Sequence, residues 1–175
     1  KQMFAHFDCH QDLDGLQLVL QLNGFLPKDI TIYNINAVAD NANCRFDALS
    51  RTYQYHIIQQ KSPFTENAYL LTKDLNIEAM NLACKHLLGK QDFTSFSKVN
   101  TQTFTNNCNV MLANWKQTGI ELIFTIKADR FLRNMVRAIV GTLLAVGEGK
   151  IKSEQVKEII AEKDRSKAGT SVPAH

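Results

Sequence analysis

The sequence predicts an α+β fold in which helices pack on one face of a mostly antiparallel sheet. Three observations lead to this prediction: β-branched and aromatic segments alternate with polar residues, separate helical segments each carry an apolar stripe, and two strand-like segments adjoin at Thr118-Gly119 as in a hairpin. Helices that cover one face of such a sheet bury its apolar side. We expect two related subdomains, the first incomplete, over residues 1–45 and 46–175.

The composition is that of a globular protein. With 175 residues, 45% of them hydrophobic, the chain can bury a substantial core, and no apolar run approaches the roughly 20 residues that span a bilayer. The net charge is only +3, so nucleic-acid binding would need a clustered basic patch. The 4 cysteines form no CxxC pair, which favours free thiols and a cytoplasmic location without membrane association.

The first subdomain is expected to contain a helix and two strands. Asp12 is expected to cap a helix over residues 13–22, and Asn23-Gly24 is expected to end it. Residues 30–39 are mostly β-branched and alternate, as in a strand, and residues 3–7 alternate in the same way.

Two further expectations concern the ends of the chain. His6, Cys9 and His10 have the spacing of metal ligands on a helix, but the strand-like pattern around them and the lack of a fourth ligand argue against a metal site. The sequence opens directly in a strand and stops after residues 168–175 without a closing element. We therefore expect both ends to be cut.

The second subdomain is expected to run strand, helix, strand, strand, helix, helix. In that order the elements are predicted at residues 51–59, 77–88, 107–115, 120–127, 128–145 and 153–163. Asn76 is expected to cap the first helix and Gly89 to close it. Residues 91–96 form a polar and aromatic loop, for which we expect the role of a structural turn.

The segment at 128–145 is the most informative part of the chain. Beside its apolar face, Arg130, Arg133, Asn134, Arg137 and Gly141 follow helical spacing along a second line, where Gly141 leaves room for a close approach. An arginine in this position offers a planar fork to a carboxylate or a phosphate. A solvated helix face is the alternative for Arg130 and Arg133. Arg137 has apolar neighbours that would partly bury it, so it needs an acidic partner.

Five segments resemble, in order and spacing, the family of tRNA pseudouridine synthase A: residues 22–30, 45–48, 51–55, 92–96 and 131–137. The resemblance implies isomerisation of uridine to pseudouridine in the anticodon stem-loop of tRNA. It also implies a homodimer, in which one tRNA contacts both subunits, and no metal or organic cofactor.

The nucleophile of that family is an aspartate in a G-R-T-D-x-G-V-H-A segment. No such segment occurs among these 175 residues, and residues 1–7 resemble the strand that follows it. No other aspartate in the sequence fits the motif. We therefore expect that these residues alone are inactive.

The resemblance also assigns candidate roles residue by residue. Arg137 aligns with the arginine that pairs with the missing aspartate, and is the candidate catalytic residue. Tyr53 aligns with the active-site tyrosine, whose ring can stack on an extruded uracil while its phenol moves a proton. A core strand tyrosine is the alternative for Tyr53, and packing is the expected role of Tyr55.

Four other positions are candidates for binding the substrate. Arg45 and Arg51 are expected near the RNA or the cleft, and Phe131 and Leu132 are expected to form an apolar wall beneath the base. Two rival interpretations remain: an RNA-binding module without catalysis, and a protein-interaction domain that uses the same apolar faces.

Overall fold

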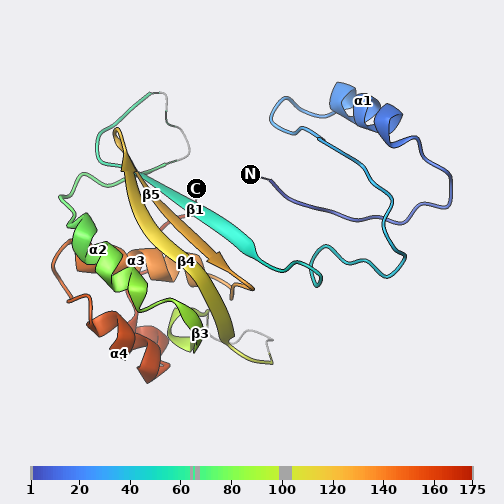
Figure 1. Cartoon of the computed structure of the whole chain (residues 1–175). Coiled ribbons are helices and arrows are strands. Elements are labelled where there is room, and N and C mark those ends of the chain that lie inside the picture. Colours follow the sequence, from blue (N-terminus) through green and yellow to red (C-terminus); the bar gives the residue numbers. More distant parts are fainter. Residues whose placement is uncertain (1, 64, 66–67, 99–103, 175) are drawn as a thin grey trace. The chain divides into compact units, whose positions relative to one another are not determined.

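The structure is a computed structural model, and it describes residues 2–63, 65, 68–98 and 104–174 (Figure 1). The chain divides into two compact units, Lys1–Ala48 and Leu49–His175. The subdomain boundaries expected from the sequence stay a prediction. None of the helices in the described part of the chain is long and apolar enough to cross a membrane.

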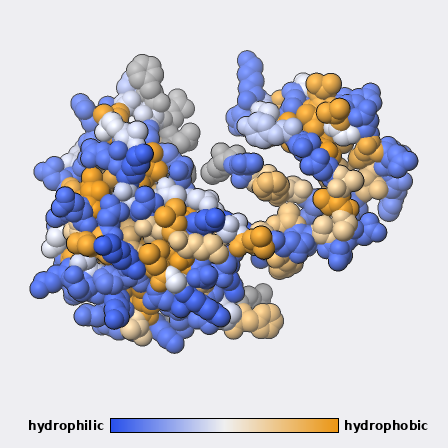
Figure 2. Space-filling model, viewed as in Figure 1, coloured by the Kyte–Doolittle hydropathy of each residue, from blue (hydrophilic) through white to orange (hydrophobic). Residues whose placement is uncertain are grey.

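The first unit contains one helix, α1 (Gly15–Phe25). The expected cap at Asp12 is wrong, because the carboxylate of Asp14 accepts hydrogen bonds from the backbone N–H groups of Leu16 (3.0 Å) and Gln17 (3.2 Å). The expected end at residue 22 is also wrong, and the helix continues through Asn23-Gly24. None of its residues is buried, and apolar side chains of this unit are exposed in Figure 2.

The strands expected at residues 3–7 and 30–39 do not form. An extended segment becomes a strand only when a neighbouring strand takes its backbone hydrogen bonds. Within residues 30–39, the side chain of Asn23 takes that place at Ile32. Its Oδ1 accepts from the N–H of Ile32 (2.8 Å), and its Nδ2 donates to the carbonyl of Ile32 (2.9 Å).

The second unit is built on a five-stranded sheet of order β2-β1-β5-β4-β3 (Figure 1). The strands are β1 (Arg51–Ile58), β2 (Tyr69–Leu70), β3 (Gly89–Asp92), β4 (Asn107–Thr118) and β5 (Glu121–Ala128). Only β1 and β2 pair in parallel. The mostly antiparallel sheet is therefore confirmed, and the hairpin at Thr118-Gly119 joins β4 to β5 as expected.

Three longer helices, α2 (Ile77–Lys85), α3 (Met135–Gly147) and α4 (Gln155–Glu162), lie on one face of this sheet (Figure 1). Two short 3-10 helices, η1 (Thr94–Phe96) and η2 (Arg165–Lys167), lie in the connections. The α+β class is confirmed. The side chain of Asn76 caps α2 as expected, but that helix ends at Lys85, and Gly89 begins β3 instead of closing the helix.

Alternating residues of β5 form the sheet side of the core. Leu122, Phe124 and Ile126 are almost fully buried, and Met135 and Ile139 of α3 are equally buried in the same cluster. Each such side chain contributes about 1.5–3 kcal/mol when it is removed from water. The core therefore fixes α3 against the middle strand of the sheet.

The helix expected at 128–145 begins only at Met135, which corrects the placement of two arginines. The ladder of β5 continues through Ala128, so the chain cannot coil until it has left the sheet. Asn134 then adopts the left-handed conformation (φ 70°) at the N-cap. Arg130 and Arg133 precede the helix, and they do not share a helical line with Arg137.

Asn81 of α2 links its helix to a stretch of β4 that has no neighbouring strand on one side. Its Oδ1 accepts from the backbone N–H of Trp115 (2.8 Å), and its Nδ2 donates to the carbonyl of Trp115 (3.1 Å). Because β3 pairs only with residues 107–110 of β4, Trp115 has no strand on that side. Asn81 therefore satisfies backbone groups that would otherwise lie unpaired beneath the helix.

We expect Asn81→Ala to lower the free energy of unfolding by about 1–3 kcal/mol, because both partly buried backbone groups of Trp115 lose their partner. Urea denaturation measures the change. Lys85→Ala, on an exposed position of the same helix, is the control and should remain close to wild type. Equal stability of Asn81→Ala and the control would contradict this account.

Candidate active site at the start of α3

The C-terminal segment (residues 168–173) packs directly on the backbone of α3. A Cβ atom at Gly141 would overlap the carbonyl oxygen of Thr170, and a Cβ atom at Gly169 would lie 2.8 Å from the carbonyl of Gly141. The backbone N–H of Gly169 also donates to the hydroxyl of Thr142 (2.8 Å). The close approach expected at Gly141 is thus confirmed, and its partner is the backbone of this segment.

Arg137 lies half-buried on α3 and is fixed by this segment. Its Nε donates to the carbonyl of Val172 (2.5 Å), and its own carbonyl accepts from the N–H of Val172 (3.2 Å). Among the described residues, no carboxylate forms an ion pair with the guanidinium and no acceptor is hydrogen-bonded to its Nη groups. One edge of the fork is therefore anchored, while the two Nη groups are not used within the described part of the chain.

Tyr55 completes the anchor. Its hydroxyl donates to the carbonyl of Pro173 (2.9 Å), and its side chain is buried. Burial and the neighbouring Tyr69 phenol raise the pKa of Tyr55 to about 12, and the charge of Arg137 offsets part of this rise. Tyr55 is therefore a neutral donor at physiological pH, and the packing role expected from the sequence omitted this hydrogen bond.

Tyr53 lies two residues earlier on the same face of β1. The residue is 48% exposed in the described structure, unlike the buried Tyr55. It meets Phe131 edge to face, with ring centroids 5.0 Å apart and planes at 89°. Leu132, the next residue, is buried in the core, and Phe131 packs partly buried against that core. The structure thus brings together Tyr53 and Phe131.

The other arginines lie in different surroundings. Arg51 begins β1 opposite Ala128, whereas Arg45 belongs to the first unit, where its guanidinium lies 5.5 Å from the ring centre of Phe46. Burial raises the pKa of Cys108 to about 11, and the nearby charge of Arg130 offsets part of this rise. Arg133 is exposed in the turn before α3.

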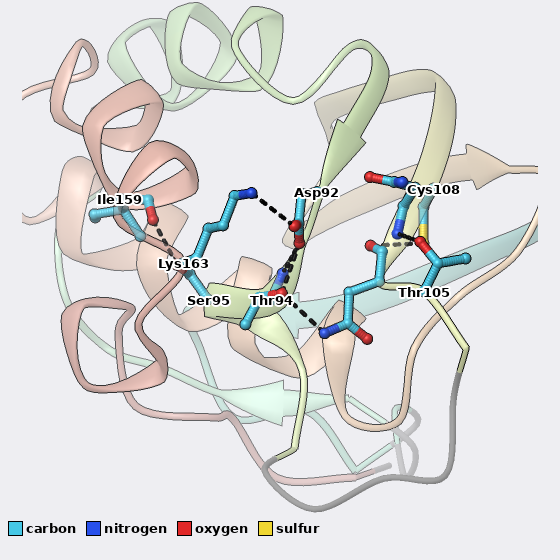
Figure 3. A network of polar contacts seen from close by, with 9 residues as sticks. Asp92, Thr94, Ser95, Thr105, Cys108, Ile159 and Lys163 are labelled. Carbon is cyan, nitrogen blue, oxygen red and sulfur yellow. Dashed lines mark hydrogen bonds and ion pairs between the residues drawn. The ribbon is translucent and has the colours of Figure 1, made fainter.

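The loop expected at residues 91–96 is wrong for Gln91 and Asp92, which end β3, while the chain turns after them into η1 (Figure 3). The carboxylate of Asp92 accepts from the N–H (3.0 Å) and hydroxyl (2.6 Å) of Thr94, and it forms an ion pair with Lys163 (3.1 Å). The hydroxyl of Ser95 donates to the carbonyl of Ile159 (2.6 Å). These contacts fasten η1 to α4 and agree with the role expected for this loop.

Several site groups could not be assigned from the sequence. Arg165 donates to two carbonyls and one hydroxyl of the C-terminal segment, and Val172 and Pro173 contribute backbone carbonyls. Gly141 was the one residue in the sequence that indicated a close backbone contact, but it did not indicate which segment makes that contact.

Taken together, the fold and the site define an α+β protein that presents an anchored arginine and an exposed aromatic pair at the edge of a helix-covered sheet. The sequence profile of the tRNA pseudouridine synthase family matches residues 83–175. The chain is 53% identical to tRNA pseudouridine synthase A of Parabacteroides distasonis, across 99% of this chain and 69% of that protein.

More distant relatives give the same result. Proteins named tRNA pseudouridine synthase A from Porphyromonas gingivalis and Bacillus subtilis are 49% and 36% identical, over 99% and 97% of this chain and 71% and 70% of theirs. The chain belongs to the tRNA pseudouridine synthase family, as the resemblance indicated.

The Asp92 network predicts a pH dependence of stability. Burial raises the pKa of Asp92, but hydrogen bonds from Thr94 and Lys163 outweigh it and lower the pKa below the ordinary value of 3.8. A carboxyl group whose pKa is lower in the folded state stabilises the protein above its unfolded pKa, and this contribution is lost as the pH falls through the folded value.

We therefore expect Asp92→Asn to lose less stability than wild type on acidification below about pH 5, as measured by urea midpoints from neutral pH to pH 3. Asp74→Asn, at an exposed position outside this network, should follow the wild-type curve. Parallel curves for Asp92→Asn and wild type would show that the network does not stabilise the folded state.

Proposed function

We propose that the intact protein isomerises uridine to pseudouridine in the anticodon stem-loop of tRNA. The observation that carries this proposal is the hydrogen bonding of Arg137. Its Nε donates to a backbone carbonyl, while its Nη groups have no acceptor in the described part of the chain. This arrangement suits a second, bidentate interaction with a carboxylate. Family membership and the names of the relatives support the choice of reaction.

The carboxylate would be the aspartate of the family's G-R-T-D segment, which is not among these 175 residues. Arg137 would hold that carboxylate ionised and aim it at the extruded nucleotide. The N1–C1′ bond of the uridine then breaks, the uracil rotates, and a C5–C1′ bond forms. The proton at C5 leaves and N1 gains one, so the reaction is an isomerisation that needs no cofactor.

Tyr53 is the candidate for contact with the base. Its half-exposed ring meets Phe131 at a right angle and could stack on an extruded base. Its phenol is also a candidate for removing the C5 proton. Phe131, which packs against the core, and the buried Leu132 would form the apolar wall beneath the uracil. These roles are proposals that rest on the placement of the side chains.

Arg45 and Arg51 are each proposed to contact the RNA. Two arginines suit phosphate contacts, which add affinity without sequence preference. We further propose that the intact protein is a homodimer whose subunits share one tRNA. Since the 175 residues lack the aspartate motif, we propose that alone they bind RNA without catalysis.

The reaction predicts release of tritium from tRNA labelled at carbon five of uridine. The intact gene product should release it, and residues 1–175 alone should not. A tRNA whose anticodon stem-loop uridines are replaced by cytidine serves as the control and should give no release. Binding of tRNA by the intact protein without any release would overturn the synthase in favour of an RNA-binding module. A lack of salt-dependent tRNA binding would favour a protein-interaction domain.

In the intact protein, we expect Arg137→Leu to reduce turnover by about 100-fold or more while tRNA affinity changes little, because the catalytic carboxylate loses its cation. Single-turnover rates and filter-binding affinities measure the two effects separately. Lys157→Met, which removes an exposed cation of α4, is the control and should leave both unchanged. Equal losses of rate and affinity would instead make Arg137 a phosphate contact.

A further inference from the structure

Arg165 uses its guanidinium inside the protein, on the segment that holds Arg137. Its Nη1 donates to the carbonyls of Ala168 (3.3 Å) and Gly169 (3.2 Å), and its Nη2 donates to the hydroxyl of Ser171 (2.9 Å). Within the described residues it forms no ion pair with a carboxylate. Its fork therefore fixes three acceptors that are close together in the sequence.

Ser171 links this arginine to the start of α3. Its hydroxyl also accepts from Nδ2 of Asn134 (2.6 Å), the left-handed residue that precedes the helix. Arg165 and Asn134 thus both donate to the Ser171 hydroxyl oxygen. The backbone at Ser171 is thereby fixed relative to the first turn of α3.

The next two residues carry the contacts to the site. The backbone of Val172 bonds Arg137 in both directions, and the carbonyl of Pro173 accepts from Tyr55. Val172 is the only residue of the C-terminal segment that is fully buried. Apolar contacts alone therefore give the segment little register, and its hydrogen bonds decide where the Val172 carbonyl lies.

We propose that Arg165 is a positioning residue for Arg137: by fixing residues 168–171, it places the Val172 carbonyl that anchors the Nε of the catalytic guanidinium. This inference rests on the proposed role of Arg137. A shift of about 1 Å in a catalytic group is enough to slow a reaction by about 100-fold, so a residue that acts only through another can matter to the rate.

The test uses Arg165→Met in the intact protein with tRNA as substrate. We expect the single-turnover rate to fall by about tenfold to 100-fold, with tRNA affinity within about twofold of wild type. The acid limb of the pH–rate profile should move to higher pH, because a carboxylate whose cation has shifted binds a proton more readily. A purely structural role would not move that limb.

Two further variants sharpen the test. Arg165→Lys should recover only part of the rate, because an ammonium group cannot reproduce the planar fork on three acceptors. Ser171→Ala removes one of the three contacts of Arg165, together with the hydrogen bond from Asn134, and leaves the two carbonyl contacts of Arg165 in place. It should shift the acid limb in the same direction by a smaller amount, even if Arg165→Met fails to fold. Lys167→Met removes a cation of the same 3-10 helix whose ion pair is with Glu162, and it is the control.

Wild-type rate and acid limb in folded Arg165→Met, or in Ser171→Ala where Arg165→Met does not fold, would overturn the inference. Parallel losses of rate and tRNA affinity would also overturn it, since they would make Arg165 an RNA contact. Arg137→Leu separates the two levels. Retained turnover in Arg137→Leu would sink the proposed catalytic role of Arg137, and a lack of tritium release by the wild-type protein would sink the proposed function. Loss of turnover in Arg137→Leu beside an unaffected Arg165→Met would sink only the positioning role.

Discussion

The contact between the backbones of α3 and the C-terminal segment is the constraint on which the site depends. It requires two residues without side chains, Gly141 and Gly169, because a Cβ atom on either would collide with the opposite backbone. Because the two backbone segments lie this close, the N–H of Gly169 donates to the hydroxyl of Thr142. The carbonyls of Val172 and Pro173 then lie within hydrogen-bond distance of Arg137 and Tyr55. The anchoring of the arginine follows from the absence of two methyl groups.

The choice of anchor also decides the electrostatics of the site. A carbonyl satisfies the Nε of Arg137 without cancelling its charge, whereas a carboxylate in that place would have formed a closed ion pair. A half-buried cation of this kind still favours a negative partner. Tyr55 likewise adds no negative charge to the site: a phenol is neutral near neutral pH, and burial raises the pKa of Tyr55 further, to about 12. The hydrogen bonds thus hold Arg137 in place, and its positive charge is not neutralised by a carboxylate among the described residues.

The sequence predicted the strands and helices whose apolar residues recur at a regular spacing. Alternation located β1, β4 and β5, and apolar stripes located α2 and α4. It could not locate β2 and β3, which are too short for a period and of which β3 has no apolar side chain. It placed the start of α3 too early, because the apolar spacing continues back to Phe131 while the ladder of β5 continues to Ala128. In the first unit, alternation predicted strands that lack a pairing partner.

The two tyrosines of β1 show why the site itself was harder to predict. Tyr53 and Tyr55 alternate on one face of one strand, so every argument from periodicity gives them the same role. The difference comes from what covers them: the C-terminal segment reaches the hydroxyl of Tyr55, whereas Tyr53 meets Phe131 edge to face and stays half exposed. The C-terminal segment contacts Tyr55 through a backbone carbonyl. Since every residue carries a carbonyl, no residue type in the sequence marks which of the two tyrosines is covered.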